Sequence, residues 1–280
     1  MKNHVKNQCA SYLKLFSTNG AGVMKGKQNS LKCEVTNTKS NVVTVQEMHS
    51  TQKGKFHIPD FVSFEAIRKK KCGGTLVAVH KNLKPKLIEE YSEDFELLVV
   101  EIETDDKSIR IMSGYGPQEN WDENERLPFF LALETEVEKA ELAGKSIVIE
   151  MDANSKLGSK YIPNDPHEIS PNGYLLAGII DRHNLIVANG TDKSEGVITR
   201  RRVTKHRIEE SAIDIVLFSQ DMMKHFVSFK VDEKRKHVLT KVTRKKRVQK
   251  LKRSTTMYWK LSLTVIYLNP KRRKNKKYTI

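Results

Sequence analysis

Acidic and amide residues that follow apolar runs are the part of this sequence best suited to chemistry. The run "SIVIEMDAN" reaches Asp152 with Asn154 two residues later, "NVVTVQE" ends on Glu47, and "SAIDIVLF" carries Asp214 near its start. An ionised carboxylate beside a buried strand needs a metal ion or a hydrogen-bond network as its partner. If these strand ends meet, their oxygens form the kind of ligand set that suits Mg²⁺ or Mn²⁺. Each acid taken alone is better explained as an ordinary turn residue.

Two glycine-containing segments strengthen this set. In "SGYGPQE", Tyr115 stands between two glycines and is followed by Pro117, a pattern that favours a rigid loop presenting a phenol. In "KCGGTLVAV", two glycines precede a strand; they allow a close backbone approach, although a plain turn explains them equally well.

The elements that must position these residues are short strands and long helices. Runs rich in Val and Ile with turn-like flanks predict strands, and two stretches with helical spacing of apolar residues predict helices. The predicted strands cover 41–46, 75–80, 95–103, 109–115, 146–152, 185–189, 197–203 and 212–219, and the predicted helices cover 127–145 and 172–184. This pattern indicates packed sheets covered by helices, an α/β or α+β arrangement in one domain that ends near residue 230.

The positive charge of the chain is concentrated at its C-terminal end. Of the 280 residues, those from 234 onward include 18 Lys and Arg and no acid, so the net charge of +16 becomes −2 without them. Such a tail could bind phosphates, but a solvated extension explains it at least as well.

Several classes of protein do not fit the sequence. No apolar run approaches the roughly 18 to 20 residues of a membrane span, and the N-terminal segment lacks an apolar run of signal-peptide length. The cysteines, Cys9, Cys33 and Cys72, have no metal-ligand spacing, and their odd number suits a reducing compartment. We therefore expect an intracellular protein, nuclear or cytoplasmic, without an obligate protein partner.

Six segments taken in chain order resemble the endonuclease/exonuclease/phosphatase family, in particular the endonuclease domains of non-LTR (LINE-type) retrotransposons. They are "QE" at 46–47, "GGTLVAV", "GYGPQ", "MDANSKLG", "NGYLLAGIIDRHNL" and "SAIDIV", and the resemblance spans roughly residues 17–237. It implies a four-layered sandwich of two mixed β-sheets flanked by helices. It also implies phosphodiester or phosphomonoester hydrolysis with Mg²⁺ or Mn²⁺, DNA as the ancestral substrate, and a reverse transcriptase as a candidate fusion partner.

The resemblance assigns roles position by position. Glu47 matches the metal-binding glutamate of the "QE" motif. Asp152 matches the aspartate that orients or deprotonates the attacking water, and Asn154 matches the amide that donates to a phosphate oxygen in the transition state. Tyr115 matches a phosphate-contacting tyrosine.

The chain departs from the family pattern at both ends. Ser211 and Asp214 match the "S-x-I-D" motif, whose aspartate orients a histidine near the chain end, but the Ser-Asp-His segment that carries this histidine is missing. His237 precedes the expected position among basic residues, and we interpret it as a surface histidine. Ser17 stands where the family has the first Asn of an Asn-x-Asn-Gly segment, and serine is too short to replace that amide.

A single-nucleotide deletion would explain the missing segment. Codons for Arg-Ser-Asp-His-Asn-Val-Leu-Glu become codons for "RSTTMYWK", residues 253–260, when one G is removed from the aspartate codon. The hypothesis is that the chain is out of frame after about residue 253, so that "LSLTVIYL" (261–268) would be an exposed segment without a partner strand. Sequencing the gene tests it, because codons that give no Asp-His-Asn-Val-Leu in the neighbouring frame would exclude it.

These observations predict three regions and leave three functions open. The regions are a poorly ordered segment with a remnant of the first strand (1–30), an endonuclease/exonuclease/phosphatase-like domain (31–233) and a basic tail (234–280). The chain could be a competent metal-dependent DNA-nicking endonuclease, a degenerate relic that binds nucleic acid, or a phosphatase or interaction module on the same fold. Losing one group of a cooperating catalytic set lowers rates by orders of magnitude, so we favour the relic for activity.

Overall fold

The computed structural model describes residues 13–20, 22, 26–50, 52–67, 73–104, 107–203, 208–233, 257–260 and 264–268. None of the helices in this part of the chain is long and apolar enough to cross a membrane.

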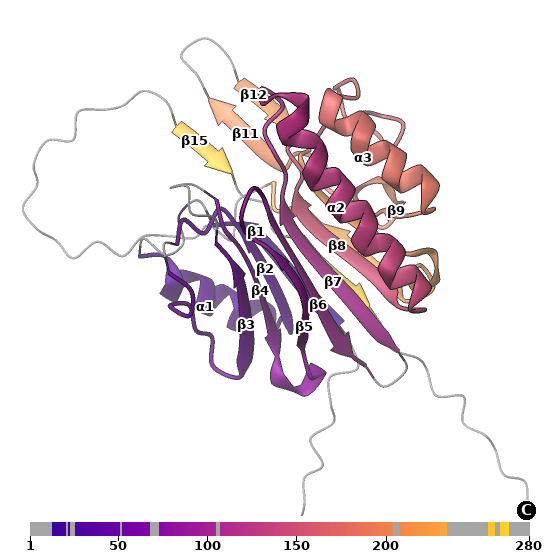
Figure 1. Ribbon diagram of the computed structural model, residues 1–280. Helices are drawn as coiled ribbons and strands as arrows, with labels where there is room; N and C mark the ends of the chain where they lie inside the picture. Colours follow the sequence, from indigo (N-terminus) through magenta and orange to yellow (C-terminus); the bar gives the residue numbers. More distant parts are fainter. Residues whose placement is uncertain are drawn as a thin grey trace, which may run out of the picture.

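The described strands form two large sheets and one small sheet (Figure 1). The strand order is β10-β14-β16-β1-β2-β4-β3 in the first sheet, β5-β6-β7-β8-β13-β9 in the second and β12-β11-β15 in the small one. Both large sheets are mixed, because β1 is parallel to β2 but antiparallel to β16, and β7 is parallel to β8 but antiparallel to β6. The strands are β1 (Leu13–Asn19), β2 (Val42–Gln46), β3 (Phe61–Ala66), β4 (Thr75–His80), β5 (Lys86–Tyr91), β6 (Glu96–Glu103), β7 (Ser108–Tyr115), β8 (Ser146–Asp152), β9 (Ile186–Val187), β10 (Ser194–Glu195), β11 (Arg200–Val203), β12 (Ile208–Ser211), β13 (Asp214–Phe218), β14 (Phe226–Lys230), β15 (Met257–Lys260) and β16 (Thr264–Leu268).

Helices cover the outer face of each large sheet. On the first sheet, α1 (Gln28–Thr38) packs through Leu31 and Val35. On the second, α2 (Glu123–Leu142) and α3 (Pro171–Arg182) lie side by side (Figure 1). A further apolar cluster fills the space between the two sheets. The layers are thus α1, the first sheet, the second sheet, and α2 with α3, which confirms the predicted four-layered α/β sandwich.

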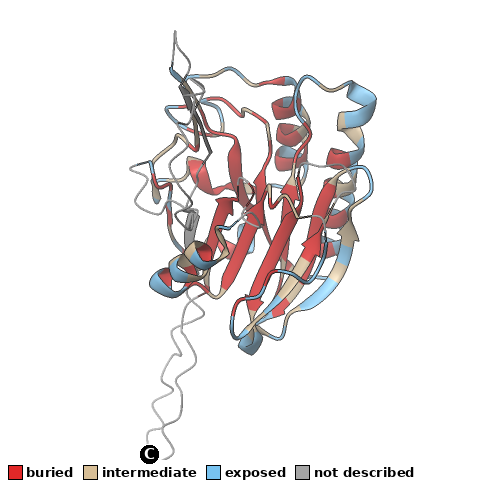
Figure 2. Cartoon of the chain, turned by 90° about the vertical axis from the view of Figure 1, so that its left-hand side faces the viewer, coloured by how far each residue is buried: buried red, intermediate tan, exposed pale blue. Residues whose placement is uncertain are grey.

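Inward-facing side chains change from apolar to polar along the central strands. On β8, Val148 belongs to the apolar cluster between the sheets, and Glu150 and Asp152 follow on the same face because alternate residues of a strand share a face. The parallel strands β1 and β2 repeat this change and end on Asn19 and Gln46. These central strands are buried along almost their whole length (Figure 2). Polar groups therefore gather at one end of the inter-sheet layer, with an apolar core at the other.

Most predicted elements are present, with shifted ends. The strand β4 has the predicted bounds, and β8 ends on Asp152 as expected. The helix α2 begins at Glu123, before the predicted 127, because Asp122 and Glu125 form a capping box there. The strand predicted at 185–189 is confined to Ile186–Val187 and is followed by a short 3₁₀ turn.

The described part of the N-terminal region forms a full strand and the start of a helix. Instead of a strand remnant, β1 is a seven-residue strand inside the first sheet, paired with β2 and β16, and α1 already begins at Gln28. The segment "LKLFSTN" has no clear alternation because nearly all of its residues are buried, on both faces of the strand. Residues 1–12 lie outside the described residues.

The C-terminal tail also contributes to the sheet. Residues 264–268 form β16, which pairs antiparallel with both β1 and β14, and β15 pairs with β11. The expectation that this segment has no partner strand is therefore wrong. His237, with the remainder of 234–256, lies outside the described residues.

Candidate metal and phosphate site

Glu47 and Tyr115 meet where β2 and β7 end. The Tyr115 hydroxyl donates to Oε1 of Glu47 at 2.9 Å. Burial and the neighbouring Glu47 carboxylate raise the pKa of the Tyr115 phenol well above its usual value, against smaller opposing effects of Asn154 and Gln118. The phenol therefore stays protonated at neutral pH and acts as a donor. Glu47 has φ +50°, a left-handed conformation that is uncommon outside glycine and that turns the chain out of the strand.

A pair of glycines supports the backbone after Glu47. The N–H groups of the next two residues donate to the carbonyls of Gly74 (3.1 Å) and Gly73 (2.9 Å). Glu96, which is buried, accepts the Gly74 N–H at 3.1 Å, and a Cβ on Gly73 (φ +112°) would lie 2.3 Å from Oε1 of Glu96. Of the two sequence interpretations, a plain turn or a close approach, the close approach is correct.

Asp152 occupies the centre of the polar end of the inter-sheet layer. It is fully buried, Nδ2 of Asn19 donates to its Oδ2 at 3.0 Å, and its Oδ1 lies 3.4 Å from the backbone nitrogen of Asn154. In the sheet its neighbours are Tyr115 on β7 and Asp214 on β13. Strand register alone therefore places three of the predicted residues side by side.

Asn154 joins the loops that follow β7 and β8. It has φ +44°, and its Nδ2 donates to the Gly116 carbonyl at 2.8 Å. The Gly116 N–H donates to the Asp152 carbonyl at 2.8 Å, and a Cβ on Gly116 would lie 2.4 Å from the Ala153 carbonyl oxygen. Asn172, near the start of α3, donates to the Asn154 carbonyl at 3.1 Å. The loop that presents the phenol is thus held by backbone contacts.

Asp214 begins β13 and is anchored by Thr199. The Asp214 N–H donates to Oγ1 of Thr199 at 3.1 Å, and the Asp214 carbonyl accepts from Nδ2 of Asn189 at 3.1 Å. Ser211 is buried, and its carbonyl accepts the Thr199 N–H at 3.1 Å. Thr199 therefore fixes both ends of the "S-x-I-D" segment, while the predicted substrate contact of Ser211 stays a prediction.

Ser17 lies below Asp152, further from the strand ends and beside Glu150 in the space between the sheets. Oγ1 of Thr44 lies 2.8 Å from Oγ of Ser17 and 2.7 Å from Oε2 of Glu150. Glu150 is fully buried, and its Oε1 has no hydrogen-bond partner among the described residues. Burial raises the pKa of Glu150 to about 7, with only the Thr44 hydrogen bond opposing it. Serine therefore replaces the family's asparagine close to Glu150, an acid beneath the site whose hydrogen bonds are incomplete among the described residues.

The structure gathers five of the six predicted site residues at one end of the sandwich. These are Glu47, Tyr115, Asp152, Asn154 and Asp214, linked by hydrogen bonds or by strand register, with Ser211 three residues before the last. The sequence analysis gave no role to Asn19, although Asn19 and Gly20 match the last two positions of the Asn-x-Asn-Gly segment that begins at Ser17. It also gave none to Glu150, which stands on the same face as Asp152.

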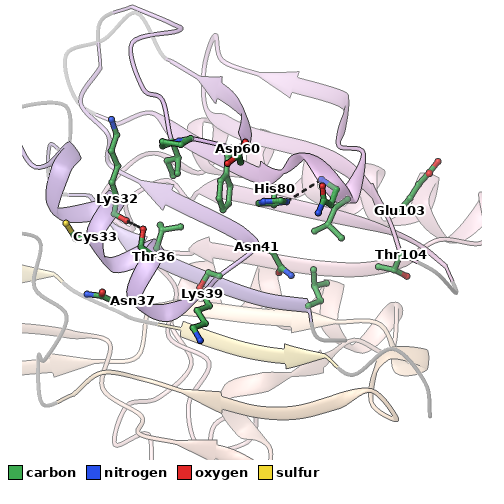
Figure 3. Close-up of a pocket in the computed structure, with 18 residues that line it drawn as sticks. Lys32, Cys33, Thr36, Asn37, Lys39, Asn41, Asp60, His80, Glu103 and Thr104 are labelled. Carbon is green, nitrogen blue, oxygen red and sulfur yellow. Dashed lines mark hydrogen bonds between the residues drawn. The ribbon is translucent and has the colours of Figure 1, made fainter. Parts of the chain in front are cut away.

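A cavity of about 770 Å³ lies away from these residues. It lies beside α1, near the start of β2 and the ends of β4 and β6 (Figure 3). Its lining includes Lys39, Asn41, Asp60, His80 and Glu103. Because Asn41 precedes β2 whereas the site begins where β2 ends, the cavity and the candidate site lie at opposite ends of the strands. The cavity contains none of the predicted site residues.

Comparison with known proteins gives matches in structure. No protein-family model matches the sequence, and no curated protein matches it. The endonuclease domain of TRAS1, a telomere-specific non-LTR retrotransposon, matches with a TM-score of 0.62 and 16% identity over 93% of this chain and 100% of the other. The AP endonuclease LMAP from Leishmania major matches with a TM-score of 0.68 and 11% identity over 93% of this chain and 88% of the other. TDP2 of D. rerio, complexed with a single-strand DNA product, matches with a TM-score of 0.59 and 11% identity over 93% and 100%. The chain therefore has the endonuclease/exonuclease/phosphatase fold.

Proposed function

We propose that the polar end of the inter-sheet layer is a metal-dependent phosphodiester-hydrolysing site of the nuclease type, with DNA as its substrate and with impaired turnover. The observation that carries the proposal is the convergence of Glu47, Tyr115, Asp152, Asn154 and Asp214 at neighbouring strand ends. Their groups are carboxylates, an amide and a protonated phenol, which together suit a cation, a phosphate and an attacking water.

Glu47 is the residue that would hold the metal ion. Its carboxylate is half-buried and oriented by the Tyr115 hydroxyl, and the carboxylates of Asp152 and Asp214 stand nearby in the sheet. This set offers oxygen ligands without thiols, which fits Mg²⁺ or Mn²⁺. When bound, such an ion polarises a phosphate and offsets its developing negative charge.

The remaining side chains would act on water and phosphate. Asp152, held by the Asn19 amide, would orient the attacking water and accept its proton. The Asn154 amide contacts the Gly116 carbonyl and the Tyr115 hydroxyl, and it would turn one hydrogen from the hydroxyl to a phosphate oxygen in the transition state. The protonated Tyr115 phenol would donate to the same phosphate.

Turnover is impaired in this proposal because part of the family's set is replaced. The chain has no Ser-Asp-His segment for Asp214 to work with, and it has Ser17 where the family has Asn. An aspartate that orients a missing histidine loses its catalytic purpose. The frameshift after about residue 253 remains our explanation for this loss.

DNA is the proposed substrate for two reasons. Structures with this fold include a retrotransposon endonuclease, an AP endonuclease and a TDP2 complexed with single-strand DNA. In addition, Arg200, Arg201 and Arg202 follow directly after Thr199, which anchors Asp214, and a basic run follows residue 233. Such groups suit the phosphate backbone of nucleic acid.

A plasmid-nicking assay tests the proposal. The full chain is incubated with supercoiled plasmid and Mg²⁺, beside a variant that combines Ser17→Asn, Thr255→Asp and Thr256→His. We expect open circles to form at least about 100-fold faster with the combined variant, because restored acid–base and phosphate contacts commonly contribute that much. Adding Asp152→Asn to the combined variant is the matched control and should abolish nicking.

Each outcome decides between the functions left open. Nicking by the natural chain as fast as by the combined variant would show that turnover is not impaired. Absence of nicking by both, with hydrolysis of a phosphomonoester, would show a phosphatase instead. Absence of both activities would overturn the catalytic proposal altogether.

A further inference from the structure

A cluster of two glutamates and a histidine lies on the outer helices, apart from the site described above. Glu134 and Glu138 are one turn apart on α2, and His183 directly follows α3. One potential ligand atom from each lies within 4.8 Å of the other two. The two helices that carry them lie side by side (Figure 1). Because these residues come from both helices, a group bound to all three would connect α2 to α3.

His183 is oriented toward this cluster by a third glutamate. Its Nδ1 lies 2.8 Å from Oε2 of Glu141, and since a carboxylate can only accept, Nδ1 carries the hydrogen. A metal ligand at this position would therefore be Nε2, on the other side of the ring. Nε2 is buried, makes no hydrogen bond within the described part of the chain, and lies 3.5 Å from Oε1 of Glu134. The His183 side chain is only 9% exposed, so water has little access to this nitrogen.

This arrangement has the features of a histidine metal ligand. Histidines that bind metals commonly donate their second N–H to a carboxylate, which fixes the ring and leaves the other nitrogen for the ion. The C-terminal end of α3 adds partial negative charge beside His183. Glu138 is exposed and is therefore able to move toward an ion.

One contact competes with this interpretation. Nε of Arg182 lies 2.5 Å from Oε1 of Glu134, and Arg182 lowers the pKa of that glutamate. A protonated His183 between Glu141 and Glu134 would make the group an ion-pair network without a metal. The two alternatives differ in whether a divalent cation binds, and in which residues its binding depends on.

We propose that Glu134, Glu138 and His183 form a second cation site, for a divalent ion of the zinc type that accepts both nitrogen and oxygen ligands, and that this site ties α2 to α3. Two carboxylates and one imidazole suit Zn²⁺ or Co²⁺ with water in the remaining position. Its ligands differ from the all-oxygen set at Glu47, so the proposal does not depend on the proposed nuclease function.

Titration of the full chain with Co²⁺ in excess Mg²⁺, which occupies the all-oxygen set at Glu47, tests the site; binding is followed by visible absorption and by calorimetry. We expect one binding event with nitrogen and oxygen ligation and without a thiolate charge-transfer band, which excludes the cysteines. Glu138→Gln and His183→Gln should each weaken this event at least about tenfold. Glu141→Ala removes the carboxylate that orients His183 and should weaken it by about 10- to 100-fold. Zn²⁺ should compete with Co²⁺ and raise the melting temperature of the natural chain.

Controls separate this site from the one at Glu47. Glu123→Gln, which makes the same change at an exposed position of α2, should leave Co²⁺ binding unchanged, and so should Glu47→Gln. Co²⁺ binding that survives both Glu138→Gln and His183→Gln would overturn the proposal. Absence of the binding event in the natural chain would do so as well, and would leave an ion-pair network.

Discussion

Glu150→Gln should make the protein more stable above neutral pH and should flatten the dependence of its stability on pH. Glu150 is fully buried, has one hydrogen bond from Thr44 at 2.7 Å, and has a pKa raised by burial from its ordinary 4.5 to about 7. Because the folded state holds this proton more tightly, the contribution of Glu150 to the unfolding free energy is fully present below pH 4.5. It is lost as pH rises through about 7.

The magnitude follows from the two pKa values. At about 1.4 kcal/mol per pH unit, the difference between 4.5 and about 7 corresponds to about 3 kcal/mol. Glutamine keeps the size of the side chain and an acceptor for Thr44, and it does not ionise. We therefore expect the unfolding free energy of the variant, relative to the natural chain, to rise by about 3 kcal/mol between pH 4.5 and pH 8.

Urea denaturation in EDTA at several pH values measures this difference. Glu168→Gln, the same change at an exposed glutamate, controls for the loss of one negative charge. A stability difference between Glu150→Gln and the natural chain that stays constant from pH 4.5 to pH 8 would refute the reasoning.

Three further perturbations test the packing around the site. Gly116→Ala places a Cβ 2.4 Å from the Ala153 carbonyl oxygen. We therefore expect the free energy of unfolding to fall by about 1–3 kcal/mol and the melting temperature to fall with it. An unchanged melting temperature would show that the loops after β7 and β8 are free to separate. Tyr115→Phe removes the 2.9 Å hydrogen bond to Glu47 and should lower the free energy of unfolding, measured with urea in the absence of metal, by about 1.5–3 kcal/mol. An unchanged free energy of unfolding would mean that this hydrogen bond is not formed in solution. Truncation after residue 252 removes β16 from between β1 and β14 and should abolish cooperative thermal unfolding; a truncated chain that melts like the full one would show that folding does not need β16.

The strand ends that carry Glu47, Asp152 and Asp214 were predictable because an acid that follows a buried apolar run needs a partner in the fold. In β8, apolar residues fill both faces from Ile147 to Ile149, and the last two inward positions, Glu150 and Asp152, are polar. The strand can end on Asp152 because this residue faces Asn19 across the layer and Tyr115 and Asp214 within the sheet. Three predicted acids at strand ends therefore indicated one site, although each alone resembled a turn residue.

The features that the sequence did not predict are set by contacts with residues distant in the chain. The segment of β1 lies between two strands, one from each end of the chain, so its own residues carry no clear alternation. The placement of β16 follows from pairing with β14 and β1, which local propensity does not specify. The sequence did not predict a role for Glu150, because its full burial beneath the site, with a hydrogen bond from Thr44, is not visible in the motif.

Anomalous diffraction from crystals of the full chain soaked in Mn²⁺ tests the central proposal most directly. We expect a peak within coordination distance of the Glu47 carboxylate, beside Tyr115 and Asp152, and we expect Glu47→Gln to remove it. A peak that persists in Glu47→Gln, or manganese bound only at Glu134, Glu138 and His183, would contradict a metal-dependent site at the polar end of the inter-sheet layer.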